Sequence, residues 1–190
     1  NQDRDYHIFE EYAYCLVSEA RQKRINHIFK LGSNVYAFDS TTVDLGLSVF
    51  WWAKFRKKKG GIKVHTLYDV ETQIPAFFHI TEASVHDSKA MIEIPYEPGS
   101  YYIFDRGYNN FKMLYKIHQI EAYFVVRAKK NLQCKFIKWK RRLPKNVLSD
   151  ASVLLTGFYP KQYYPEPIRL VKYWDEEQER EFIFITNAMH

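Results

Sequence analysis

Two aspartates in this sequence follow short apolar runs in the same way. Asp39 follows Val-Tyr-Ala-Phe, and Asp105 follows Tyr-Tyr-Ile-Phe. An acidic residue at the polar end of a strand emerges at the edge of a sheet. If the two strands are neighbours, the carboxylates converge and repel each other, and a hard cation such as Mg²⁺ or Mn²⁺ relieves that repulsion. Such a cation can activate a water or a 3′-hydroxyl for phosphoryl displacement. The alternative is that each aspartate only caps a helix or a turn.

The sequence has 190 residues and a formal net charge of +6, and its basic residues are concentrated. One cluster occupies residues 54–63 and another occupies residues 127–145, whereas residues 171–182 lean acidic. Basic clusters of this density suit a phosphate backbone, although a solvated surface can look the same. Aromatic residues such as Trp139 interleave with them, which permits stacking on unpaired bases but is also typical of packed strands.

The elements that must position the aspartates can be read from the apolar patterns. Residues 7–30 have apolar side chains such as Ile8, Tyr12, Cys15 and Leu16 at helical spacing. We expect strands over the following ranges: 35–43, 61–70, 74–80, 101–104 and 122–127. The turn at 71–73 makes the first three an antiparallel meander. We expect helices over 88–94 and about 110–119, with Asn109-Asn110 as the cap of the second.

Beyond residue 127 the pattern predicts only strands and turns. The strand-like segments are 133–139, 152–159, 167–174 and 181–186. Three antiparallel strands followed by alternating helix and strand predict an α/β fold with a ribonuclease-H-like mixed sheet and a β-rich insertion. We therefore expect an N-terminal helical segment at 1–34, a partial catalytic core at 35–127, and the insertion at 128–190.

Several motifs in register resemble those of the large "IS-four" family of bacterial insertion-sequence transposases. They are Phe38-Asp39-Ser40-Thr41-Thr42, Gly60-Gly61-Ile62-Lys63-Val64-His65, His86-Asp87, and Phe104-Asp105-Arg106-Gly107-Tyr108. The resemblance runs from about residue 35 to 127. It implies a DDE transposase that cleaves DNA and transfers strands with Mg²⁺ or Mn²⁺, in which Asp39 and Asp105 are catalytic residues and metal ligands.

The sequence departs from the family at the third acid. The family places it on a helix with a Tyr-x-x-Arg-x-x-x-Glu pattern, and that pattern is absent here. We expect the third acid beyond residue 190, so these residues alone should bind metal weakly and be inactive.

The resemblance and the charges also suggest partners. DNA, as transposon ends and target, is the expected partner, with a homodimer for the full-length protein. We expect the following residues to contact DNA: Lys54, Arg56, Lys57, Lys58, Lys63, His65, His86, Arg106 and Tyr108. No apolar run approaches 18 residues, which argues against a membrane protein. Two cysteines without a CxxC favour reduced thiols and a cytoplasmic setting. The resemblance implies a bacterial protein that associates with the nucleoid when it acts.

Two other classes of protein share these features. A ribonuclease-H-like nuclease or resolvase would use the same metal site without strand transfer. A catalytically dead DNA-binding remnant would keep the basic surface and lack the third acid in the full gene.

Overall fold

The computed structural model of the chain describes residues 5, 7–22, 31–45, 54–56 and 59–189. They form two compact units. The first runs to His86 and includes Glu93–Pro95, and the second contains Asp87–Ile92 and the chain from Tyr96 onward. Among the described residues, no helix is both long and apolar enough to span a bilayer.

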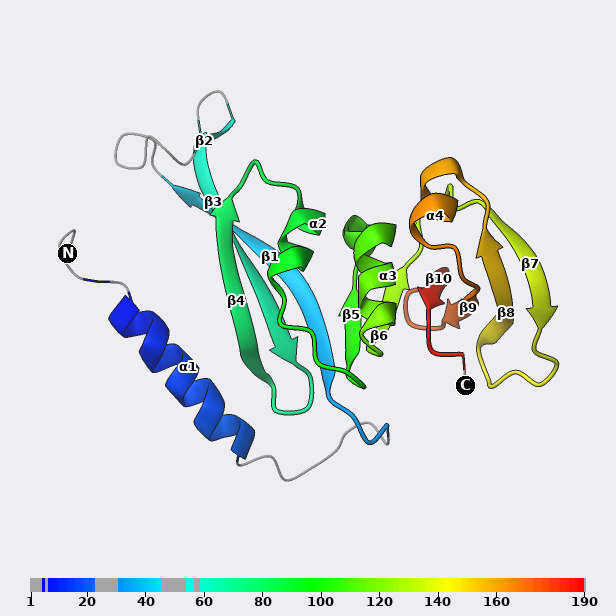
Figure 1. Cartoon of the computed structure of the whole chain (residues 1–190), viewed down its shortest axis with the longest axis horizontal. Coiled ribbons are helices and arrows are strands. Elements are labelled where there is room, and N and C mark those ends of the chain that lie inside the picture. Colours follow the sequence, from blue (N-terminus) through cyan, green and yellow to red (C-terminus); the bar gives the residue numbers. More distant parts are fainter. Residues whose placement is uncertain (1–4, 6, 23–30, 46–53, 57–58, 190) are drawn as a thin grey trace. The chain divides into compact units, whose positions relative to one another are not determined.

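The first unit is a helix and an antiparallel sheet (Figure 1). Its elements are α1 (His7–Gln22), β1 (Val35–Leu45), β2 (Lys54–Arg56), β3 (Lys59–Asp69) and β4 (Ile74–Glu82). Strand β3 pairs antiparallel with β1, β2 and β4. The predicted meander is therefore confirmed, and β2 is a short additional strand that the sequence patterns did not predict.

The turn between β3 and β4 is built around Asp69. The buried Asp69 carboxylate accepts hydrogen bonds from the backbone N–H of Glu71 at 2.9 Å and of Thr72 at 3.2 Å. Gln73 takes a positive φ of 59°, and its N–H donates to the Asp69 carbonyl at 2.9 Å. An aspartate that bonds the backbone two residues on favours a tight turn, which explains the predicted hairpin at 71–73.

The first half of the second unit supplies a parallel strand pair and its helix. It contains α2 (Asp87–Ala90), η1 (Met91–Glu93), β5 (Tyr101–Phe104), η2 (Arg106–Tyr108), α3 (Phe111–Gln119) and β6 (Tyr123–Arg127). Strands β5 and β6 pair in parallel, with Phe104 opposite Val126. The Asn110 side chain caps α3 by accepting from the Met113 N–H at 3.3 Å. The helix buries Met113, Leu114 and Ile117.

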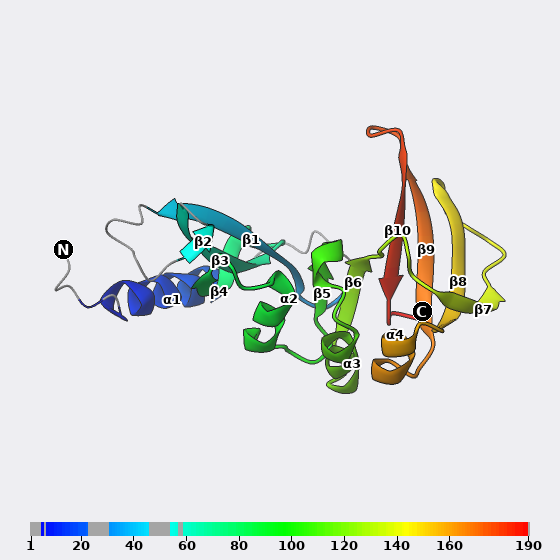
Figure 2. The same ribbon diagram turned by 90° about the horizontal axis from the view of Figure 1, so that it is seen from above.

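The second half of this unit continues the sheet with antiparallel strands. Its elements are β7 (Cys134–Trp139), β8 (Val147–Leu155), α4 (Phe158–Tyr163), β9 (Ile168–Asp175) and β10 (Arg180–Thr186). Strand β10 pairs with β6 and β9, and β8 pairs with β9 and β7. Figure 2 shows β10, β9 and β8 side by side. The strand-rich character predicted for residues 128–190 is present.

The structure corrects the expected elements in three places. Helix α4 occupies residues expected to be the end of a strand and a turn. The expected helix over 88–94 is one α-helical turn followed by one 3₁₀ turn. Strand β1 continues to Leu45, so Asp39 lies within the strand rather than at its polar end. Residues 23–30 of the predicted N-terminal helix lie outside the described residues.

The side of α1 that packs differs from the predicted apolar stripe. Tyr14 stacks on Phe78 of β4, with ring centroids 5.0 Å apart. Ile8, Tyr12 and Leu16, the apolar residues at helical spacing in the sequence, are exposed.

Candidate metal-binding and DNA-binding site

Asp39 is an exposed residue on β1 of the first unit. It lies opposite Thr66 of β3, after the buried residues Val35, Tyr36 and Phe38. The Ser40 N–H donates to Asp39 Oδ1 at 2.8 Å, which orients the carboxylate along the strand. The apolar start of β1 therefore anchors the strand, and the carboxylate faces solvent.

The neighbouring strand β3 carries Lys63 and His65, both expected to contact DNA. His65 is fully buried; it forms a hydrogen bond of 3.0 Å between its Nε2 and Thr81 Oγ1. Its ring also stacks near Phe38, with centroids 6.1 Å apart. The expectation that His65 contacts DNA is therefore corrected, because its side chain packs inside the unit.

Lys63 is half-buried and holds the loop after β4. Its Nζ donates to the Val85 carbonyl at 2.8 Å. The next residue, His86, is exposed. Lys63 thus stabilises the loop of the first unit that leads to His86.

Asp105 directly follows β5 in the second unit. Its side chain is 57% exposed, whereas Tyr101, Tyr102 and Phe104 before it are buried. Its carbonyl accepts from the Tyr108 N–H at 3.0 Å, which closes the 3₁₀ turn η2. A buried strand and a tight turn together fix the backbone of this aspartate.

Asn109 ties that turn to the end of β6. Its Nδ2 donates to the carbonyl of Arg106 at 2.8 Å and to the carbonyl of Arg127 at 2.9 Å. The sequence suggested only a helix cap at this place, and the cap is Asn110. The role of Asn109 becomes visible only when β5 and β6 are paired.

Arg127 lies beside Asp105. Phe104 of β5 and Val126 of β6 are paired in the sheet, and Asp105 and Arg127 are the residues that come directly after them. Both therefore lie at the carboxyl ends of parallel strands. Arg127 Nη1 is 3.9 Å from Asp105 Oδ1, and its guanidinium lies 4.7 Å from the centroid of the Phe182 ring. A half-exposed ion pair contributes little stability, so its main effect is to place positive charge near the carboxylate. The sequence placed Arg127 only in a basic cluster.

The two residues flanking Gly107 have different exposures. Arg106 is exposed, whereas Tyr108 is 2% exposed and packs against Phe104 with ring centroids 5.9 Å apart. Tyr108 is therefore removed from the expected DNA contacts for the same reason as His65. Lys57 and Lys58 lie outside the described residues, and of Lys54 and Arg56 the structure describes the backbone in β2.

The donor set of the two aspartates fits a hard cation. Both are exposed carboxylates on or after a strand, and carboxylate oxygens are the ligands that Mg²⁺ and Mn²⁺ prefer. Within the part of the chain that the structure describes, no group of three or more His, Cys, Asp or Glu side chains could hold a metal ion. Asp39 belongs to the first unit and Asp105 to the second, so their joint use of one cation stays a prediction.

Exposed carboxylates on strands and clustered basic residues are groups that a metal-dependent enzyme acting on a polyanion could use. The chain belongs to the family described as Transposase DDE domain, which matches residues 30–188. The predicted resemblance to insertion-sequence transposases is thereby confirmed.

Two relatives support the same family. A candidate transposase of Sinorhizobium fredii, y4zB, is 36% identical over 103 residues, which are 54% of this chain and 29% of the relative. A probable transposase for insertion sequence element IS5377 of Geobacillus stearothermophilus is 25% identical over 152 residues, which are 80% of this chain and 40% of the relative. The chain thus spans less than half the length of these curated relatives.

Among solved structures, endonuclease V from Bacillus subtilis aligns with 96% of this chain and 76% of its own. The TM-score is 0.36 and the sequence identity is 12%, values too low to support an inference about the fold.

Proposed function

We propose that this chain carries two of the catalytic carboxylates of an insertion-sequence transposase that cleaves and joins DNA. The observation that supports this most is the family match over residues 30–188, which includes both Asp39 and Asp105. The complete protein would cut DNA at the ends of its element and join the 3′-hydroxyl to target DNA.

Asp39 and Asp105 would hold Mg²⁺ or Mn²⁺ in this reaction. A divalent cation supplies charge stabilisation for in-line phosphoryl displacement and activates the attacking oxygen. The residues of the chain would do the remaining work. The turn held by Asn109 fixes the Asp105 backbone, and the exposed side chains of Arg106 and His86 are proposed to contact DNA phosphates.

Arg127 is proposed to place positive charge beside the Asp105 carboxylate and to orient it. The guanidinium is near one oxygen of that carboxylate and also contacts the Phe182 ring. Lys54, Arg56, Lys57 and Lys58 remain proposed DNA contacts because of their charge. A homodimer is proposed for the complete protein because two element ends must be brought together.

The experiment is cleavage of a DNA duplex that carries the element's ends by the complete protein encoded by this gene. Asp39→Asn and Asp105→Asn should each abolish cleavage, because an amide is a weaker ligand than a carboxylate for a hard cation. Salt-sensitive DNA binding should persist in both variants. Asp44→Asn, which changes another exposed aspartate of β1, is the matched control and should cleave normally. Robust cleavage by either test variant would refute the proposal.

Joining products separate transposition from plain nuclease activity. The wild-type protein should yield strand-transfer products when a target duplex is present. Cleavage without any joining would instead favour a ribonuclease-H-like nuclease.

A further inference from the structure

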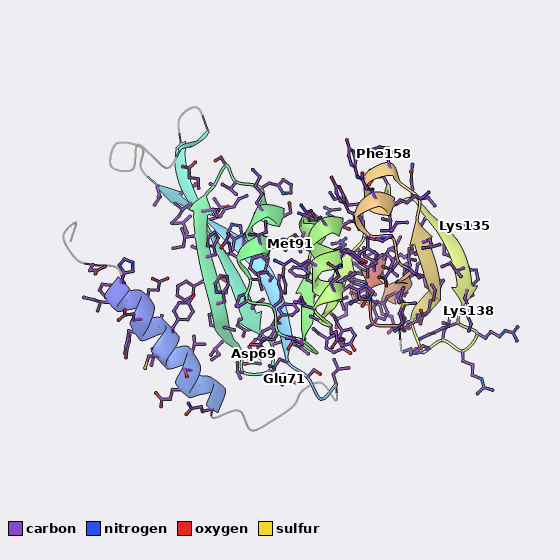
Figure 3. All side chains as sticks on the ribbon, in the orientation of Figure 1. Asp69, Glu71, Met91, Lys135, Lys138 and Phe158 are labelled. Carbon is purple, nitrogen blue, oxygen red and sulfur yellow. The ribbon has the colours of Figure 1, made fainter. Side chains whose placement is uncertain are left out.

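Helix α4 exposes three large aromatic side chains. Phe158 is 80% exposed, Tyr159 63% and Tyr163 41%. The rings contact one another: Phe158 and Tyr159 meet edge to face at 5.2 Å, and Tyr159 stacks on Tyr163 at 6.3 Å with an angle of 9°. Figure 3 shows Phe158 projecting from α4. Clustered aromatic rings left in solvent mark a binding surface.

A pocket of about 410 Å³ adjoins these rings within the second unit. Its lining includes Asn109, Phe111, Lys129, Asn131, Gln133 and Tyr159. This volume is in the range of pockets that hold small organic ligands, roughly 300–1,000 Å³, so it can accept a nucleobase. Asn109 lines the pocket and also holds the turn after Asp105 through its hydrogen bonds. The pocket therefore adjoins the turn that carries the proposed catalytic carboxylate.

The charged and polar side chains at the pocket indicate which class of ligand it binds. Lys129, which lines the pocket, is exposed, and so are Lys130 and Lys161, which follow lining residues in the sequence; none of the described residues that line the pocket is acidic. The amide side chains of Asn131 and Gln133 can donate to and accept from the edge of a base. Aromatic faces, amides and lysines together match a nucleotide: a flat apolar ring, polar edges and a phosphate.

We propose that the α4 aromatic surface (Phe158, Tyr159, Tyr163) and this pocket bind unpaired nucleotides of the DNA strand on which the enzyme acts. Base pairs inside a duplex are stacked on each other and hide their faces, so exposed rings of this kind favour unpaired bases. The inference rests on the proposed function, because that function makes DNA the partner and places its strand beside Asp105. Nothing in the family match or in the relatives' names assigns this surface.

The test measures binding of the 190-residue chain to a fluorescein-labelled single-stranded oligonucleotide and to a duplex of the same sequence. Phe158→Ala and Tyr159→Ala should each weaken single-strand binding by about tenfold, since one base–aromatic stack is worth about 1–3 kcal/mol. Duplex affinity should change less than about twofold, because its phosphates are bound by lysines. Tyr159→Phe keeps the ring and should bind like the wild type.

Tyr12→Ala is the matched control. Tyr12 of α1 is also a large aromatic side chain that is exposed, at 64%. It belongs to the first unit and lies outside every segment proposed to bind DNA, so its loss should leave single-strand affinity nearly unchanged. Far-ultraviolet circular dichroism should be the same for all four variants, because all the changed side chains are exposed.

Three results would overturn the inference. The α4 variants could lose no more single-strand affinity than Tyr12→Ala, or they could lose single-strand and duplex affinity equally. Sedimentation could instead show a dimer that Phe158→Ala dissociates, in which case the surface binds a second copy. Failure of the proposed function is seen separately. Cleavage by the Asp39→Asn protein would refute the function and leave the α4 binding result standing.

Discussion

At the scale of single residues, Asn109 is the side chain that gives the Asp105 turn its shape. Its two donated hydrogen bonds join the carbonyls of Arg106 and Arg127, and thereby connect the turn after β5 with the end of β6. No local sequence rule identifies this role. The sequence predicts Asp105 as a candidate ligand, because an acid after four apolar residues is a local pattern. The role of Asn109 depends on the pairing of β5 with β6, two strands that lie roughly twenty residues apart in the sequence.

Substitutions at Asn109 test whether its two donated hydrogen bonds stabilise the protein. Asn109→Ala removes both donors and should lower stability by about 1–3 kcal/mol, at about 0.5–1.5 kcal/mol for each hydrogen bond. Asn109→Asp should be worse, because it presents an oxygen to two carbonyl oxygens. Chemical denaturation of the 190-residue chain measures both. If the aspartate variant is as stable as the wild type, the proposed bridging role is wrong.

At the scale of elements, β8 and β9 are joined by a buried ion pair. The Asp150 side chain is 5% exposed and receives two hydrogen bonds from Arg169, from Nε at 2.8 Å and from Nη2 at 2.7 Å. Arg169 also donates to the Ala188 carbonyl at 3.2 Å. The Arg169 hydrogen bonds hold the pKa of Asp150 below its ordinary value despite the opposing effect of burial. Asp150 is therefore charged in the folded protein and depends on Arg169.

Asp150→Asn should destabilise the second unit by about 3 kcal/mol, because it leaves the Arg169 charge without its carboxylate. The matched control is Lys145→Ala, which breaks the exposed pair of Lys145 and Glu176 and should leave the denaturation midpoint nearly unchanged. An equal effect of the two substitutions would contradict the importance assigned to the buried pair.

The same pair predicts a pH dependence of stability. Because the folded state has the lower pKa, the stabilisation from Asp150 is complete above the unfolded pKa of about 3.9 and is lost as the pH falls through the folded value. The wild-type chain should therefore lose more stability than Asp150→Asn on acidification below about pH 4. Denaturant midpoints measured across that range check this. Parallel loss in both proteins would rule out Asp150 as a contributor.

The elements also show where sequence patterns succeed. Strand β5 matches its predicted range because all four residues are apolar and turns bound them. Helix α4 was missed because Phe158, Tyr159 and Tyr163 also have high strand propensity, and Pro160 was read as a break. Proline is tolerated in the first turn of a helix, where its missing N–H is not needed. The lengths of α4 and β8 depend on packing that a local pattern does not contain.

At the scale of the whole molecule, the charges are unevenly distributed along the sequence. The formal net charge is +6. The exposed cations Lys129, Lys130, Lys135 and Lys138 follow β6 or lie on β7, and Figure 3 labels the last two on that strand. The turn between β9 and β10 carries the exposed acids Glu176, Glu177 and Glu179. The basic segment is therefore expected to contact DNA and the acidic turn is not.

The salt dependence of DNA affinity tests whether the basic segment contacts DNA. The affinity of the 190-residue chain for duplex DNA should fall steeply with salt, and the slope of log K against log salt should decrease by about one for each phosphate contact removed. Lys129→Gln with Lys130→Gln should reduce the slope, whereas Lys116→Gln on α3 should leave it unchanged. Equal slopes for all proteins would show that DNA binds elsewhere.

The most direct test of the central claim is metal-dependent rescue of cleavage at the two aspartates. Asp39→Cys and Asp105→Cys in the complete protein should be inactive with Mg²⁺, because a thiolate is a poor ligand for that hard cation. They should regain part of their activity with Mn²⁺, which accepts sulfur better. Asp44→Cys should be active with both ions. Normal cleavage with Mg²⁺ by Asp39→Cys or Asp105→Cys would contradict the assignment of these residues as metal ligands.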